Sequence, residues 1–179
     1  MYITQLVHRH LQQRPNHVAV VDWGQGEEYT FEDIADRVAR FASAIQSLGV
    51  LENDRIGILS LNSIHYLEYS LAVPWAGCAI NPVNIRWSAN EIAYSLDDSD
   101  TRILLVDDAF LPLVEDIKSR SSALRTLIYI GSSESPEGML VYEELVAMLC
   151  QCLMPCAVVM TCWVCSTPVV PLVFQRALC

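Results

Sequence analysis

Charged side chains are almost absent from the end of this sequence. After Ala147 only Arg176 is charged, whereas residues 1–147 hold all 21 acidic residues and 10 of the 11 basic residues. The first part therefore has a net charge of 10 − 21 = −11. Such a surface would repel a phosphate backbone instead of releasing its counterions, so nucleic acid is excluded as an expected partner. The composition divides the chain into residues 1–147 and residues 148–179.

Cysteine is scarce in the first part, where Cys78 is the only one of the seven in the chain. Residues 1–15 also lack the apolar stretch of a secretory signal and include the polar run His8, Arg9 and His10. Neither feature indicates an oxidising compartment, so we expect a cytoplasmic protein. Hydrophobic residues make up 53% of the chain, which is typical of a globular protein with a sizeable core.

The beginning of the pattern predicts a hairpin followed by a helix. Residues 17–31 contain two β-type runs on either side of a Gly-Gln-Gly turn. In residues 30–49 the apolar side chains recur at helical spacing. Thr30 and Asp33 can cap the start of this helix, and Gly49 can end it.

Further apolar runs alternate with helical segments up to Ala147. The expected strands are residues 55–61, 78–83, 101–108 and 124–131. The expected helices are residues 62–77, 88–100 and 109–122, with another beginning in 139–147. Pro74 should stop the first helix from running on, Ser88 and Glu91 have capping-box spacing, and 131–138 reads as a surface loop. Strands that alternate with helices at this interval predict an α/β fold with a mainly parallel sheet flanked by helices.

Few residues of this first part are candidates for chemistry. The acid pairs Asp97–Asp98 and Asp107–Asp108 can act in general acid–base or metal chemistry, but each follows an apolar segment. Carboxylates in that position commonly cap a helix or face solvent, which is the reading we favour. His65 lies within a helix, where a single histidine is more often packed or exposed than catalytic.

Two further features are equally unspecific. Arg86 beside Trp87 can bind an anion, or it can stack on the ring and pair with Glu91. The glycine-containing run "GQGEEY" lacks the spacing and the strand-to-helix context of a phosphate loop. Residue chemistry alone therefore assigns no catalytic, cofactor-binding or metal-binding residue.

Residues 29–50, 54–100 and 102–108 nevertheless carry a family resemblance. In the middle segment a helix leads into a Gly-x-x-x-Asn-Pro turn, then Asn-x-Arg, then a helix start of the form Ser/Thr-x-x-Glu. The segment resembles the N-terminal part of the AMP-forming acyl-CoA synthetases, which include the fatty acid–CoA ligases. The residues that match are Gly77, Asn81, Pro82, Asn84, Arg86, Ser88 and Glu91.

The resemblance implies an incomplete N-terminal subdomain of an acyl-adenylating enzyme. Such an enzyme converts ATP and a carboxylic acid into an acyl-adenylate and pyrophosphate, and then passes the acyl group to coenzyme A, with Mg²⁺ balancing the phosphate charge. Its phosphate-binding loop, rich in Gly and Thr with one Lys, should follow soon after residues 141–147. That loop is absent in readable form, so we expect no ATP, Mg²⁺ or coenzyme A site in this chain and no activity. The segment around Asn81 favours a fatty or medium-chain acid as the substrate of the intact enzyme.

The missing loop reappears when the tail is read one nucleotide back. Each displaced codon takes the last base of one residue's codon and the first two bases of the next. Only a few amino acids are therefore possible at each displaced position. Residues 166–179 then permit FYTGGTTGFPKGVM, which resembles the family's phosphate loop, and residues 160–165 permit DDLLGV. We therefore predict that residues 148–179 are an out-of-frame tail with no domain of their own, the slip falling near Ala147.

The tail is also compatible with a metal site or a membrane anchor. Cys162 and Cys165 have the spacing of a zinc or redox pair, but the remaining tail cysteines, Cys150, Cys152, Cys156 and Cys179, are irregularly spaced. Residues 157–175 are uncharged as a membrane anchor would be, but Pro168 and Pro171 interrupt them. An unselected apolar tail should instead be disordered, aggregate or be cut by proteases.

Two classes of function remain. In the first, the chain is a catalytically inactive piece of an acyl-CoA ligase. In the second, residues 1–147 act as a binding or regulatory module that associates with an intact synthetase. Self-association is a further expectation from the family resemblance, because family members often self-associate.

Overall fold

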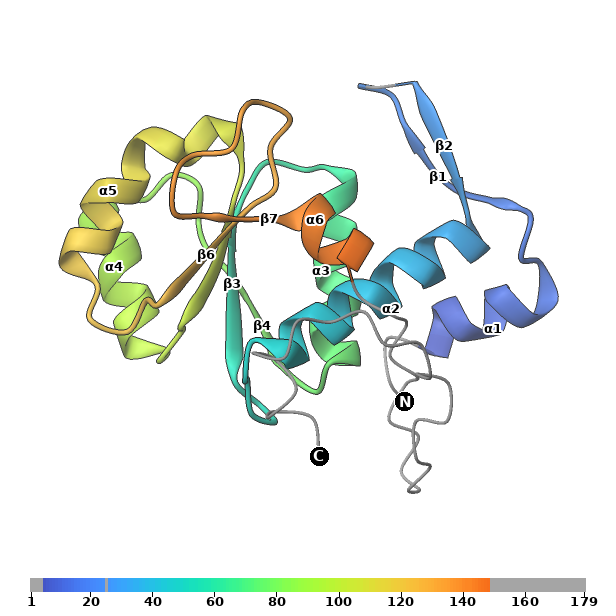
Figure 1. Cartoon of the computed structure of the whole chain (residues 1–179), viewed down its shortest axis with the longest axis horizontal. Helices are drawn as coiled ribbons and strands as arrows, with labels where there is room; N and C mark the ends of the chain where they lie inside the picture. Colours follow the sequence, from blue (N-terminus) through green and yellow to red (C-terminus); the bar gives the residue numbers. More distant parts are fainter. Residues whose placement is uncertain (1–4, 25, 149–179) are drawn as a thin grey trace.

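A parallel sheet forms the centre of the molecule (Figure 1). The computed structural model describes residues 5–24 and 26–148. The sheet has five strands in the order β4-β3-β5-β6-β7, and every neighbouring pair is parallel. The strands are β3 (Arg55–Leu59), β4 (Ala79–Pro82), β5 (Ile103–Val106), β6 (Thr126–Tyr129) and β7 (Leu140–Val141). The predicted α/β fold with a mainly parallel sheet is confirmed, although β7, only two residues long, was not expected.

Helices cover both faces of this sheet. One face packs against α2 (Phe31–Ser47), α3 (Ile64–Trp75) and α6 (Tyr142–Met148). The other packs against α4 (Ala89–Asp98), a 3₁₀ turn (Asp108–Phe110) and α5 (Leu111–Arg120). Alternate residues of β5 point to opposite faces, because successive side chains of a strand do so: Ile103 and Leu105 lie in the first core, and Leu104 and Val106 in the second.

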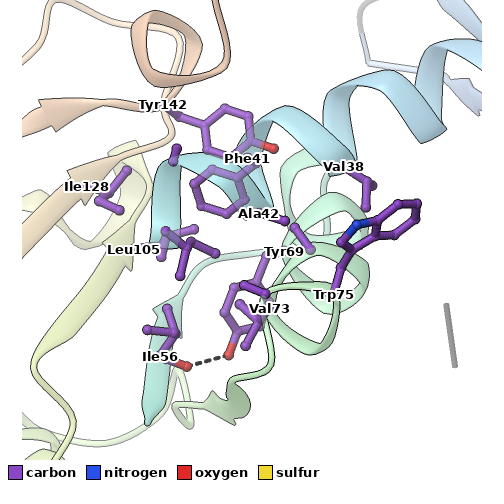
Figure 2. Close-up of a cluster of buried hydrophobic side chains, with 14 of the residues drawn as sticks. Val38, Phe41, Ala42, Ile56, Tyr69, Val73, Trp75, Leu105, Ile128 and Tyr142 are labelled. Atoms are coloured by element: carbon purple, nitrogen blue, oxygen red, sulfur yellow. Dashed lines mark hydrogen bonds between the residues drawn. The ribbon is translucent and has the colours of Figure 1, made fainter. Parts of the chain in front are cut away.

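The first core is the larger and is shown in Figure 2. Ile56, Leu105 and Ile128 reach it from three strands, and all three are buried. Phe41 from α2 lies over them. Tyr69 enters from α3, and its hydroxyl donates a 2.7 Å hydrogen bond to the carbonyl of Ile56, so its polar end is satisfied although the ring is buried.

The N-terminal region adds a helix and a separate hairpin. Helix α1 (Gln5–Gln13), which the sequence pattern did not predict, contacts α2 and buries only Val7. The expected hairpin is present as β1 (Val18–Asp22) and β2 (Glu27–Thr30), paired antiparallel. These two strands form their own sheet and project away from the parallel one in Figure 1.

The helix boundaries follow the predicted signals. Thr30 and Asp33 form a reciprocal capping box at the start of α2, and Ser88 and Glu91 form another at the start of α4. Gly49 has φ 78°, a left-handed conformation that glycine adopts without steric strain, where α2 gives way to a turn. Helix α3 ends at Trp75, one residue after Pro74. Within the described residues no helix is both long and apolar enough to cross a membrane.

Candidate functional site

The strand order points to the carboxyl ends of β3 and β5. The chain passes from β3 to β4 on one side, then crosses back to β5 on the other side of β3. In open α/β sheets such a change of direction leaves a crevice outside the strand ends, where ligands usually bind. Residues 60–63 and 107–110 form this edge and are the first candidate site.

Asp107 lies at this edge, and both its carboxylate and its amide are hydrogen-bonded within the fold. Its carboxylate accepts hydrogen bonds from the amide of Leu61 at 2.7 Å and from the amide of Ala109 at 3.0 Å. Its own amide donates to the carbonyl of Leu59 at 3.3 Å. The side chain therefore joins the ends of β3 and β5 and caps the 3₁₀ turn, as the structural reading of this acid pair predicted. A second carboxylate follows at Asp108, so the edge is unsuited to phosphate.

Asp108 joins the next strand to the same edge. Its carboxylate accepts a hydrogen bond from the hydroxyl of Tyr129 and another, at 2.9 Å, from the amide of Ser132. The hydrogen bond from Tyr129, with those from the following serines, lowers the pKa of Asp108. Burial, and then this carboxylate, raise the pKa of Tyr129. Neither group is poised to exchange a proton near neutral pH.

Gly131 lies under this pair and is required by the close approach. A Cβ atom at this position would lie 2.5 Å from Asp108 Cγ and 2.5 Å from the hydroxyl oxygen of Tyr129. Gly131→Ala should therefore lower the free energy of unfolding by about 1–3 kcal/mol, the usual effect of overpacking. Chemical denaturation of both proteins measures this difference. Ser132→Ala is the matched control and should change stability by less than about 0.5 kcal/mol; an equal loss in the two variants would contradict a steric cause.

The acid pair at the end of α4 is divided between two roles. Asp97 accepts hydrogen bonds from the hydroxyl of Ser121 at 2.7 Å and from the amide of Ala123 at 2.9 Å, and so holds the loop after α5. The bond from Ser121 is the main cause of the lowered pKa of Asp97. Asp98 is exposed, and its carboxylate makes no hydrogen bond or ion pair with any described residue. The two carboxylates do not form a paired site.

The structure does not bring Arg86 and Glu91 together. Glu91 accepts from the amide and the hydroxyl of Ser88, both at 2.8 Å, because its carboxylate completes the capping box. Arg86 is exposed, and its guanidinium makes no ion pair within the described part of the chain. Of the two alternatives for Arg86, the one in which it pairs with Glu91 is therefore not realised. In the run "GQGEEY", Gly24 and Gly26 belong to the hairpin connection and Glu27 begins β2, as its lack of phosphate-loop context predicted.

Asn81 of the Asn-Pro motif is a structural centre. Its amide nitrogen Nδ2 donates to the hydroxyls of Ser99 at 3.0 Å and Thr101 at 2.8 Å, and its backbone amide donates to the hydroxyl of Tyr69 at 2.8 Å. It thereby ties β4 to helix α3 and to the turn that leads into β5. Gly77, four residues earlier, has φ 84°, which accounts for the glycine of the motif.

A partly buried ionic cluster joins α2, α3 and α6, and the sequence analysis missed it. Glu68 is 0% exposed and accepts hydrogen bonds from the guanidinium of Arg37 and, at 2.7 Å, from the hydroxyl of Tyr142. Arg37 also binds Glu143 at 2.7 Å, and Glu143 lies 3.0 Å from Nε2 of His65. We call these five residues the α6 clasp. His65 is thus packed against α6, one of the two outcomes expected of a single helical histidine.

The geometry of the clasp shifts the pKa values of three of its side chains. Burial opposes the charge on Arg37, but its hydrogen bonds to Glu143 and Glu68 outweigh that effect and raise the pKa of the guanidinium. Burial, followed by the nearby Glu68 carboxylate, raises the pKa of Tyr142. The hydrogen bond with His65, together with those from Arg37, lowers the pKa of Glu143 to about 2. Arg37 and Glu143 therefore stay charge-paired throughout the neutral range.

The pKa of Glu143 predicts an acid dependence of stability. Since the pKa is lowered on folding from an ordinary value of 4.5 to about 2, the stabilisation is complete above 4.5 and is lost as the pH falls through 2. The Glu143→Gln variant should lack this part of the pH dependence, because its side chain cannot ionise. Urea denaturation between these pH limits compares the two proteins. Parallel pH curves would contradict the assignment, and the effect should be modest because the side chain is half exposed.

No group of three or more potential metal-ligating side chains lies together among residues 5–24 and 26–148. The tail cysteines, including the pair Cys162 and Cys165, lie outside the described residues. So do the proposed displaced phosphate loop and the uncharged run 157–175.

Comparison with known proteins identifies the family. Residues 7–151 match the family described as AMP-binding enzyme. A long-chain-fatty-acid–CoA ligase of Thermus thermophilus is 34% identical over 68% of this chain. A fatty acid–acyl-carrier-protein ligase of Streptomyces coeruleorubidus is 32% identical over 73% of it. The chain belongs to the AMP-binding enzyme family.

A solved structure shares the fold of this chain. The crystal structure of an anthranilate CoA ligase in complex with anthranoyl-AMP superposes on 82% of the chain with a TM-score of 0.76, at 24% identity. The chain corresponds to 28% of that structure. It spans 22% of the Thermus relative and 24% of the Streptomyces relative, so about three quarters of each relative has no counterpart here.

Proposed function

We propose that this chain is the N-terminal segment of an enzyme that joins a fatty acid to coenzyme A, and that these 179 residues alone are inactive. The intact enzyme would convert ATP, acid and coenzyme A into acyl-CoA, AMP and pyrophosphate. The family match over residues 7–151 carries the proposal. The names of the relatives support a fatty or similar carboxylic acid as the substrate. We further propose that the enzyme acts in the cytoplasm, because residues 1–147 hold a single cysteine, Cys78.

The described residues support a scaffolding role for this segment. Asp107, Asp108 and Asp97, which are the candidate carboxylates nearest to strand and helix ends, all bind backbone or hydroxyl groups of the fold. ATP, Mg²⁺ and coenzyme A would be held by residues of the intact enzyme beyond this segment. Removal of groups that position a substrate and stabilise developing charge should abolish turnover.

We further propose that residues 148–179 are read in a displaced frame and form no domain. The match to the family ends at residue 151, which is 151 − 147 = 4 residues past Ala147. The displaced reading of residues 166–179 as FYTGGTTGFPKGVM supplies the loop that the family resemblance calls for. Determining the nucleotide sequence from codon 148 onward tests this. If the displaced frame of these codons encodes a different sequence, the proposal is wrong.

Activity is tested with the purified 179-residue chain. We expect no acid-dependent ATP–pyrophosphate exchange above background with fatty acids of short, medium or long chain. The same gene with the frame restored and continued to its next stop codon should gain exchange activity. Exchange by the 179-residue chain would contradict its proposed inactivity. An inactive but folded restored protein would count against the ligase assignment itself.

The second candidate is a binding or regulatory module. The observation that favours it is that residues 5–148 build two buried apolar clusters and satisfy their own polar groups at the strand ends. Such a unit can fold and dock without the catalytic parts. Co-purification with an intact synthetase, performed with the full chain and with residues 1–148, tests this role and separates the contribution of the tail.

A further inference from the structure

A shallow, open groove of about 700 Å³ lies along α4 and the end of α5. It is on the sheet face opposite the α6 clasp, and none of the clasp residues lines it. Two aromatic side chains border it: Trp87 is 37% exposed and Tyr94 is 73% exposed. Large aromatic rings in contact with water are common anchors of protein–protein contacts, because they offer much apolar area with little conformational freedom to lose.

One line of side chains on α4 faces this groove. Asn90, Tyr94 and Asp98 are four residues apart, so they follow one another on the same side of the helix, and all three are exposed. The line presents an amide, then an aromatic ring, then a carboxylate. This order suits an elongated side chain with an apolar stem and a charged end.

The carboxylate of Asp98 lies where a helix disfavours it. The C-terminal end of a helix carries the negative end of its dipole and normally attracts basic residues. Helix α4 has no basic residue in its last turn and ends in two aspartates. Asp97 is satisfied by the loop after α5, whereas Asp98 has no partner among the residues that the structure describes. An unfavourable charge that has no compensating contact within its own fold is expected at a surface where a partner supplies that contact.

The groove as a whole is acidic and rigidly held. Glu91, Asp97 and Asp98 contribute three carboxylates, against one guanidinium from Arg120. The capping box at Ser88 fixes the start of α4. Asp97 fixes the end of α4 to the loop after α5 through Ser121 and Ala123. Both walls are therefore placed before a partner arrives, which reduces the ordering that binding requires.

We propose that this groove is a docking surface for a basic segment of a partner protein. A lysine or arginine of the partner lays its stem across the Tyr94 ring and brings its charge to Asp98. An aliphatic neighbour of that residue packs against Trp87. Charge complementarity decides the class of partner, since an acidic or phosphate-bearing segment would meet three carboxylates. The proposal concerns the surface that the 179-residue chain itself exposes.

Fluorescence anisotropy with the full chain tests the surface. The probe is a labelled amphipathic peptide of leucine and lysine, and its twin carries glutamate in place of lysine. The lysine peptide should bind, the glutamate peptide should not, and added salt should weaken binding. Asp98→Lys should reduce the affinity by about tenfold or more, and Tyr94→Ser by a similar factor, as expected for central contacts.

Matched variants separate docking from general attraction to an acidic protein. Asp116→Lys makes the same charge change on an exposed position of α5 outside the groove lining, and Trp23→Ser removes an exposed aromatic residue of the hairpin region. Each should change the affinity by less than about twofold. Equal losses from Asp98→Lys and Asp116→Lys would overturn the proposal, as would binding of the glutamate peptide. Sedimentation showing that Asp98→Lys dissociates a dimer would assign the groove to a second copy instead and likewise overturn it.

Discussion

Replacing Glu68 by alanine should lower the free energy of unfolding by about 3–5 kcal/mol, because it breaks a buried ion pair while leaving its partners in place. Arg37 would keep only Glu143, and the hydroxyl of Tyr142 would lose its acceptor in a fully buried position. Since small domains are stable by about 5–15 kcal/mol, this is a large share of the total. Urea denaturation followed by circular dichroism measures the loss.

The loss of stability in Glu68→Ala should be concentrated in helix α6. Helix α6 is held to α2 and α3 largely through Tyr142 and Glu143, so its amides should exchange faster with solvent in Glu68→Ala than those of β5. Glu68→Gln should lose less, because its side-chain oxygen can still accept from Tyr142. Arg102→Ala removes an exposed ion pair with Asp100 and should cost less than about 0.5 kcal/mol. Uniform acceleration of exchange over the whole domain would contradict a local clasp.

The clasp also shows where prediction from sequence ends. The caps at Thr30 and Ser88 were predictable because a capping box is written within four neighbouring residues. The parallel sheet was predictable because buried strands and helices alternate along the chain. Arg37, Glu68 and Glu143, in contrast, come from three helices that meet only in the folded chain. A signal was present nonetheless: Glu68 is the only acidic residue in helix α3.

In the candidate site, too, local roles could be predicted from the sequence and contacts between distant segments could not. The structural reading of Asp97 and Asp107 follows from their positions at element ends, and their hydrogen bonds confirm it. The role of Asn81 could not be read locally, since its partners Ser99 and Thr101 follow a whole intervening helix. Proximity in sequence allows Arg86 to pair with Glu91, but the carboxylate of Glu91 is hydrogen-bonded in the capping box instead.

Truncation of Phe41 to alanine is the second large effect that we expect. The ring is 0% exposed in the core of Figure 2 and lies 4.4 Å, centroid to centroid, from the ring of Tyr142. Loss of a buried phenylalanine leaves a cavity that its neighbours fill only in part, and typically costs about 3–5 kcal/mol. Tyr94→Ala, which removes an exposed aromatic ring, should cost less than about 0.5 kcal/mol in the same denaturation experiment.

Conservative double variants measure the energetic coupling within the first core and across the sheet. Phe41→Leu combined with Tyr142→Phe should be non-additive by about 0.5–3 kcal/mol, because the two rings touch and the Tyr142 hydroxyl anchors one of them. Phe41→Leu combined with Ile117→Val should be additive within about 0.5 kcal/mol, since Ile117 belongs to the cluster on the opposite face. Coupling across the sheet equal to that within the first core would mean that the strands transmit strain between their faces, and the two clusters would then have to be treated as one.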